Sequence, residues 1–147
     1  MTSLRVECAP EHAFEVWTRR IDLWWPRGHS VSGDPDLRVE IEPRVGGRIL
    51  ERTSSGEEHV WGEVRAWEPP GRLAYLWHIY GTRPEATDVE VTFRPDGGAT
   101  RVTVTHTGWE RLAATRPDVR DRNESAWSRV LPRYAAACTT DEERTGS

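Results

Sequence analysis

Two residues of this sequence are candidates for proton transfer, His106 and Glu51. The expected position of His106 is the clearer of the two. In the run TRVTVTHTG at 100–108, His106 shares its strand parity with Val102 and Val104, so its imidazole is expected to face the core just before a turn. An inward imidazole can orient a polar group of a ligand, or act as an acid or base if its pKa stays near neutrality. The alternative, which the sequence favours, is a core histidine whose hydrogen bonds are satisfied by the backbone.

Glu51 is the second candidate. It stands in GRILERT, where Ile49, Glu51 and Thr53 alternate with Leu50 and Arg52, so parity does not show which set faces inward. Facing a cavity, Glu51 would have its pKa raised by desolvation and could accept a proton. A solvent-facing Glu51 is the interpretation that we favour. No two histidines have a metal-binding spacing, so we expect neither a metal site nor a cofactor.

Aromatic residues offer a different chemistry, which is stacking. The chain has eight tryptophans in 147 residues, and two of them, Trp24 and Trp25, are adjacent. Neighbours on a helix point about 100° apart, so one core-facing stripe does not easily bury both rings. The residues predicted to line an apolar pocket are Trp25, Tyr75, Trp77, His106, Trp109 and Trp127. The alternative is that each ring fills the core, since an aromatic side chain buries roughly 150–250 Å². For the set we favour a pocket, because eight indoles exceed what a tightly packed helix-on-sheet core comfortably holds.

The elements that must position these residues follow from periodicity. A short alternating strand at 4–8 precedes a helical stripe at spacings of three and four, formed by Phe14, Trp17, Ile21 and Trp24. Pro26 ends that stripe, because the residue before a proline disfavours helical geometry. Six alternating segments separated by turn signals then predict an antiparallel meander between residues 37 and 107.

A second helical stripe lies near the C-terminal end. Its residues are Trp127, Val130, Leu131, Tyr134 and Cys138. An interior proline costs a helix about 3 kcal/mol, so Pro132 is expected to kink it. We expect one domain over residues 1–138 and a disordered polar tail over 139–147. Cys8 and Cys138 have no CxxC spacing and are expected to be free thiols.

Composition restricts the partners. A net charge of -4 argues against a general nucleic-acid binder. There is no apolar run of membrane-spanning length and no basic-then-apolar signal sequence, so a cytoplasmic location without a membrane span is expected.

Several segments together resemble a known group of proteins. They are PEHAFEVWT at 10–18, GGRILE at 46–51, GEVRAWEPPGRLAYLW at 62–77, TDVEVTF at 87–93, TRVTVTHTGW at 100–109 and AWSRVL at 126–131. In this order the chain resembles the helix-grip superfamily called SRPBCC or START-like, and within it the family of activator of heat shock protein 90 ATPase homologues. The resemblance implies an α+β helix-grip fold, in which a curved seven-stranded antiparallel sheet wraps around a long C-terminal helix, with short N-terminal helices after the first strand. It also implies a deep cavity between sheet and helix that often holds a small apolar molecule, with Trp25 near the cavity or its mouth.

Three functions compete. The first is binding of a small hydrophobic or aromatic molecule, as a carrier, sensor or sequestering protein. The second is a cyclase or hydrolase type of enzyme, for which His106, Glu51 or a tyrosine would have to meet the ligand. The third is a protein-interaction module of the chaperone ATPase-activator type, which an exposed apolar patch would support. Sheet edges and the aromatic surplus also suggest a homodimer.

Overall fold

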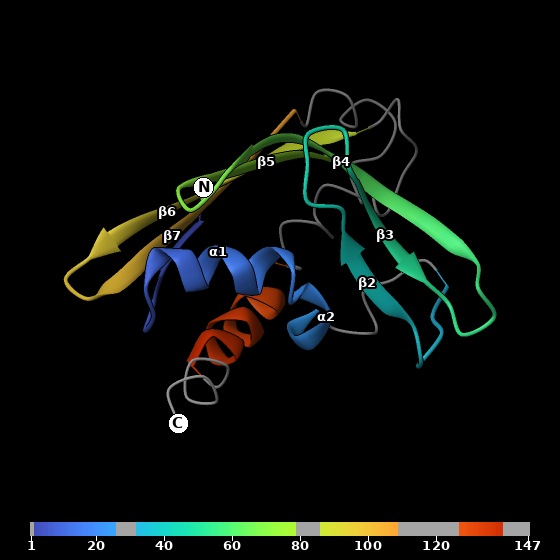
Figure 1. The fold of residues 1–147 in the computed structure, drawn as a ribbon, viewed down its shortest axis with the longest axis horizontal. Coiled ribbons are helices and arrows are strands. Elements are labelled where there is room, and N and C mark those ends of the chain that lie inside the picture. The colour runs from blue at the N-terminus through green and yellow to red at the C-terminus, as the bar shows by residue number, and fades with distance from the viewer. Residues whose placement is uncertain (1, 26–31, 79–85, 109–126, 140–147) are drawn as a thin grey trace.

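The chain folds as one curved sheet closed over helices. The computed structural model describes residues 2–25, 32–78, 86–108 and 127–139. Its labelled elements are β1 (Thr2–Val6), α1 (Pro10–Thr18), α2 (Ile21–Trp24), β2 (Arg38–Ile41), β3 (Arg48–Arg52), β4 (Glu58–Glu68), β5 (Arg72–Trp77), β6 (Thr87–Asp96) and β7 (Ala99–Thr107). Within the described ranges the seven strands form a single antiparallel sheet in the order β1-β7-β6-β5-β4-β3-β2. Figure 1 shows the sheet arching over α1, α2 and the C-terminal helix, which confirms the predicted architecture.

The concave face of the sheet is apolar because the central strands alternate. On β5, Leu73, Tyr75 and Trp77 are buried, and the residues between them are partly exposed. The neighbouring strand β6 alternates in the same way, with Val89 and Val91 buried. Side chains of successive strand residues point to opposite faces, so the helices cover one face and the charged residues occupy the other.

Curvature comes from irregularities in β3 and β4. The register between these strands shifts between Ile49 and Leu50, and the register between β4 and β5 shifts between Val64 and Ala66. A bulge bends its strand and increases the local twist. Gly62 adds a close approach of the strands, because a Cβ built on it would lie 2.0 Å from the Leu76 carbonyl oxygen.

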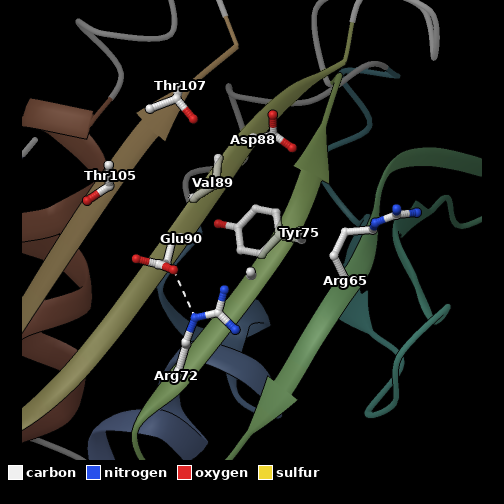
Figure 2. Close-up of a pocket in the computed structure, with 9 residues that line it drawn as sticks. Arg65, Arg72, Tyr75, Asp88, Val89, Glu90, Thr105 and Thr107 are labelled. Atoms are coloured by element: carbon white, nitrogen blue, oxygen red, sulfur yellow. Dashed lines mark hydrogen bonds and ion pairs between the residues drawn. The ribbon is translucent and has the colours of Figure 1, made fainter.

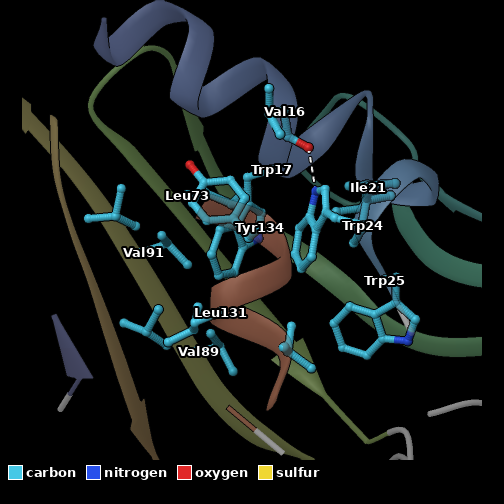
Figure 3. Close-up of a cluster of buried hydrophobic side chains, with 14 of the residues drawn as sticks. Val16, Trp17, Ile21, Trp24, Trp25, Leu73, Val89, Val91, Leu131 and Tyr134 are labelled. Carbon is cyan, nitrogen blue, oxygen red and sulfur yellow. Dashed lines mark hydrogen bonds between the residues drawn. The ribbon is translucent and has the colours of Figure 1, made fainter. Parts of the chain in front are cut away.

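The first helical stripe is broken in two. The sequence predicts one continuous stripe to Trp24, whereas the structure has separate helices α1 and α2. The carbonyl groups in the last turn of a helix have no partner within it. The Trp24 indole Nε1–H donates to the Val16 carbonyl oxygen at 2.7 Å, which satisfies one of them across the break (Figure 3).

The predicted C-terminal stripe is confirmed. Residues 127–139 are helical, the helix runs through an exposed Pro132, and all five stripe residues are buried. Tyr134 Oη donates to the Ala13 carbonyl oxygen at 2.8 Å, and Arg133 Nε donates to the Trp24 carbonyl oxygen at 2.9 Å. These bonds fix the helix to α1 and α2. Residue 139, the first of the predicted tail, still belongs to this helix, and residues 140–147 lie outside the described residues.

The structure also describes the two cysteines and the lengths of the helices. Cys8 and Cys138 are free thiols, as predicted, and both are buried. In the described parts of the chain, no helix is long and apolar enough to cross a membrane.

We predict that Gly62→Ala lowers the free energy of unfolding by about 2 kcal/mol, because the new methyl group would collide with the Leu76 carbonyl and force β4 and β5 apart. Urea unfolding followed by far-UV circular dichroism measures the loss. Gly71→Ala is the matched control: a Cβ there meets nothing within 4 Å, so its effect should stay within about 0.5 kcal/mol. Equal stabilities of the two variants would show that the close approach at Gly62 does not restrain the sheet.

Candidate functional site

Trp25 packs on the concave face of the sheet. Its ring centroid lies 5.3 Å from that of Trp61 and 5.5 Å from that of Trp77. Trp77 in turn lies 5.6 Å from Tyr75. The adjacent Trp24 turns the other way and packs at 5.1 Å from Tyr134 of the C-terminal helix. The two neighbouring indoles are therefore both buried because each has its own apolar surface (Figure 3).

A second group of rings joins the helices to the sheet. Trp17 of α1 lies 5.2 Å from Trp24, 4.8 Å from Tyr134, 6.1 Å from Trp127 and 6.3 Å from Phe93 of β6. Because Trp24 also contacts Trp25, the two groups form one continuous set of ring contacts under the sheet.

Four predicted pocket residues therefore share the concave side of the molecule: Trp25, Tyr75, Trp77 and Trp127. Each has less than a tenth of its surface exposed, which agrees with both interpretations of the sequence, pocket wall and core filler. Trp109 lies outside the described residues.

Trp61 was missed by the sequence analysis, although it is fully buried and contacts both Trp25 and Trp77. In HVWGEVRAW it alternates out of step with Val64, so parity indicates an outward ring. The register instead pairs Leu50 with Val60 and Ile49 with Gly62, which leaves Trp61 as the extra residue of the bulge. An extra residue reverses the parity on one side of it. No pattern in the sequence marks the position of that bulge.

Glu51 is fully buried, so the favoured prediction of a solvent-facing Glu51 is wrong. The set formed by Ile49, Glu51 and Thr53 is the one that faces inward, since all three side chains are buried. The carboxylate Oε1 accepts a hydrogen bond from Trp61 Nε1 at 2.8 Å. Oε2 accepts from the Ser32 backbone N–H at 3.0 Å and from the Ser32 hydroxyl. These three donors offset the cost of burying the carboxylate.

His106 belongs to a line of hydrogen bonds between the C-terminal helix and the sheet. Its Nδ1 accepts from Trp127 Nε1 at 3.1 Å, and its Nε2 meets Thr87 Oγ1. The Thr87 hydroxyl donates to the Trp77 carbonyl oxygen at 3.2 Å. An indole N–H can only donate, so Nδ1 must be unprotonated and Nε2 carries the proton.

Burial keeps the His106 imidazole in its neutral form. Desolvation lowers its pKa from 6.5 to about 4, so the imidazole is neutral near pH 7. With both nitrogens occupied, His106 is a satisfied histidine that positions Trp127. Its partners are side chains, where the sequence suggested the backbone.

The opposite, convex face carries a groove of different character. About 340 Å³ in volume, it is lined mainly by charged and hydroxyl side chains of β4 to β7, among them Arg65, Arg72, Asp88, Glu90 and Thr105 (Figure 2). Arg72 Nε pairs with Glu90 Oε2 at 2.8 Å. Its charged side chains do not match the apolar site that the sequence predicts.

Comparison with known proteins identifies related chains. The family model described as Activator of Hsp90 ATPase homolog 1-like protein matches residues 7–136. The solution structure of CalC, a self-sacrificing resistance protein from Micromonospora echinospora, is 26% identical with a TM-score of 0.69, covering 95% of this chain and 93% of that one. The anthrahydroquino-gamma-pyrone synthase Txn09, complexed with SUM, is 36% identical with a TM-score of 0.55, covering 75% of this chain and 76% of that one.

Two further matches give less information about function. The Aha1 dimer from Colwellia psychrerythraea is 16% identical with a TM-score of 0.67, covering 93% of this chain and 92% of that one, a likeness that shows the fold alone. The human Protein Atg16l2 is 32% identical over 71% of this chain. The chain spans only 18% of that curated relative's length, so its overall function does not carry over.

We predict that His106→Gln removes part of the acid sensitivity of the fold. Because the folded pKa is about 4 and the ordinary value is 6.5, the unfolded chain binds the proton more readily between these values. Wild-type stability should therefore fall as pH drops through this window, by at most about 1.4 kcal/mol per pH unit from this residue. Glutamine keeps a donor and an acceptor but does not titrate. Urea unfolding at several pH values between about 7 and 4.5 should give the variant a shallower slope; parallel curves would contradict the assignment.

Proposed function

The chain belongs to the family of activator of Hsp90 ATPase homolog 1-like proteins, and we propose that it binds a small hydrophobic or aromatic molecule between the concave face of its sheet and the C-terminal helix. The main observation in favour of this proposal is that aromatic rings from separate elements come together. Trp25 follows α2, Trp61 and Trp77 come from adjacent strands, and Trp127 comes from the helix on the other side. Such rings offer flat, apolar surfaces on which a planar ligand stacks.

The rings of the proposed site meet at steep angles. Trp61 and Trp77 meet edge to face at 81°, and Trp25 and Trp77 meet at 66°. Aromatic pairs prefer such contacts in packed cores and in binding sites alike. In the proposed site a planar ligand packs against the same rings.

Buried polar groups supply the orienting contacts. Glu51 is joined to the ring set through Trp61, and His106 through Trp127. Apolar walls with a few fixed polar groups are the usual composition of small-molecule sites. Two relatives support this assignment: the 26% identical CalC is a self-sacrificing resistance protein, and the 36% identical Txn09 is a synthase whose structure holds the compound SUM. Carrier, sensor and sequestering roles all follow from such binding.

We predict that the purified protein carries a stoichiometric small apolar molecule. Native mass spectrometry, followed by extraction and identification, tests for it. A clean apo mass, together with unchanged tryptophan fluorescence against a panel of aromatic and lipid compounds, would overturn the proposal.

With a bound compound identified, Trp77→Phe should weaken its affinity about three- to tenfold, because a large stacking surface is lost. Trp67→Phe is the matched control. Trp67 is only partly buried and contacts Phe14 at 5.1 Å, away from the proposed site. Its replacement should leave the affinity within about twofold. Equal losses in both variants would show that the effect is general loosening of the core.

An enzyme acting on the bound molecule is the second candidate, favoured by the 36% identity to a synthase. We take Glu51 as the candidate for proton transfer, because it is a fully buried carboxylate joined to the ring set through Trp61. If the wild type converts the extracted compound, Glu51→Gln should lower turnover at least about 100-fold with little change in affinity, and His106→Gln should retain turnover. Liquid chromatography with mass spectrometry follows the reaction. No conversion by the wild type would leave binding as the function.

A further inference from the structure

The groove on the convex face of the sheet takes no part in the proposed binding of an apolar molecule. Its volume of about 340 Å³ lies at the lower end of the range for small-molecule sites, which is roughly 300–1,000 Å³. Side chains stand side by side on the face of a sheet, so a hollow of this size needs a local cause.

Two small residues and a bulge create the hollow. Ala74 lies between the buried Leu73 and Tyr75, so its methyl group faces the convex side, and its cross-strand partner on β4 is Ala66. Beside this pair of alanines the register shifts, which leaves Arg65 as the extra residue of β4. Bulges are frequent next to functional sites, where they re-aim a side chain. Here the bulged residue lines the groove together with Ala74.

Charges of opposite sign line the two sides of the convex groove. Arg65 of β4 and Arg72 of β5 contribute guanidinium groups, and Asp88 and Glu90 of β6 contribute carboxylates. Figure 2 shows Arg65 on one side of the groove and Glu90 on the other, with Arg72 between them. The hydroxyl-bearing Thr105 of β7 is the cross-strand partner of Glu90. The groove is therefore cationic over β4 and β5 and anionic over β6.

The two guanidinium groups keep hydrogen-bonding capacity for a ligand. Arg72 donates through Nε to Glu90 at 2.8 Å and through Nη1 to Glu68 at 3.3 Å. Arg65 donates through Nη1 to Glu63 at 3.1 Å. Within the part of the chain that the structure describes, the Nη2 groups of both arginines have no hydrogen-bond partner. Exposed ion pairs of this kind contribute little to stability, so a ligand can share them.

We propose that the convex groove is a second binding site, which takes a linear zwitterion of the ω-amino acid class. The ligand carboxylate lies against the two guanidinium groups, and its ammonium group lies against the carboxylates of Asp88 and Glu90. A ligand with a single charge meets a like-charged side of the groove, which opposes its binding, whereas a zwitterion is complementary to both sides. Neighbouring strands are about 4.8 Å apart, so charges over β4 and β6 call for a separation of roughly 7–10 Å. A chain of several methylene groups has that length and lies over the Ala74 methyl group.

The test is a heteronuclear NMR titration of the full chain with ε-aminocaproate, and separately with caproate and with hexylamine, each of which carries one of its two charges. ε-Aminocaproate should shift the backbone amide signals of Ala74, Glu90 and Thr105 in a saturable way. Its affinity should lie in the millimolar range, because the charges of the groove are exposed. The two single-charge compounds should bind at least about fivefold more weakly.

Three variants locate the binding. Arg65→Gln should weaken the affinity for ε-aminocaproate about three- to tenfold, because it removes one cationic group. Ala74→Leu should weaken it at least as much, because the larger side chain fills the hollow and leaves every charge in place. Arg94→Gln is the matched control for the charge change: Arg94 is exposed on β6 and does not line the groove. Its affinity should stay within about twofold of the wild type, and near-UV circular dichroism verifies the folding of each variant.

A titration without saturable shifts overturns the inference. Binding of caproate or hexylamine as tight as that of the zwitterion overturns it too, because a single charge then suffices. So do equal losses in Arg65→Gln and Arg94→Gln, because the affinity then follows the net charge of the chain. The proposed function does not depend on these results, since the apolar molecule is placed on the opposite, concave face of the sheet.

Discussion

The ring of Trp17 is the contact on which the tertiary structure depends. It belongs to α1, yet it touches Trp24 of α2, Phe93 of β6, and both Trp127 and Tyr134 of the C-terminal helix. Every layer of the fold therefore meets at one indole. A buried aromatic residue contributes more apolar area than any aliphatic side chain, so one ring can join elements that share few other contacts.

Curvature is the second constraint. A flat sheet could not turn the rings of β4 and β5 toward those of the helices, and the bulges at Trp61 and at Arg65 supply the bend. The bulge at Trp61 also turns that ring into the interior, where it meets Glu51. Their mutual hydrogen bond makes the burial of the carboxylate tolerable, since a buried charge without donors would destabilise the fold strongly.

Three indole N–H groups donate hydrogen bonds that join elements of this core. Trp24 satisfies a helix-terminal carbonyl, Trp61 a carboxylate, and Trp127 an imidazole. Each bond ties two elements together and fixes a ring orientation, so the abundance of tryptophan serves hydrogen bonding as well as packing.

Periodicity and segment order by themselves determined the architecture. The meander, the C-terminal stripe from Trp127 to Cys138, the inward face of His106 and the free thiols were all predictable, because each depends on local alternation or spacing. The curvature of the sheet was predicted from the family resemblance. Three features were decided only by the tertiary structure: the split between α1 and α2, the burial of Glu51, and the partners of His106. The split is stabilised by a hydrogen bond from Trp24 to a carbonyl eight residues earlier. Glu51 is buried because the set of Ile49, Glu51 and Thr53 faces inward, which alternation alone could not show, since both sets of this strand contain polar and apolar residues. His106 is held by Thr87 and Trp127, residues about twenty positions away on either side, and such pairings exist only once the sheet has closed on its helix.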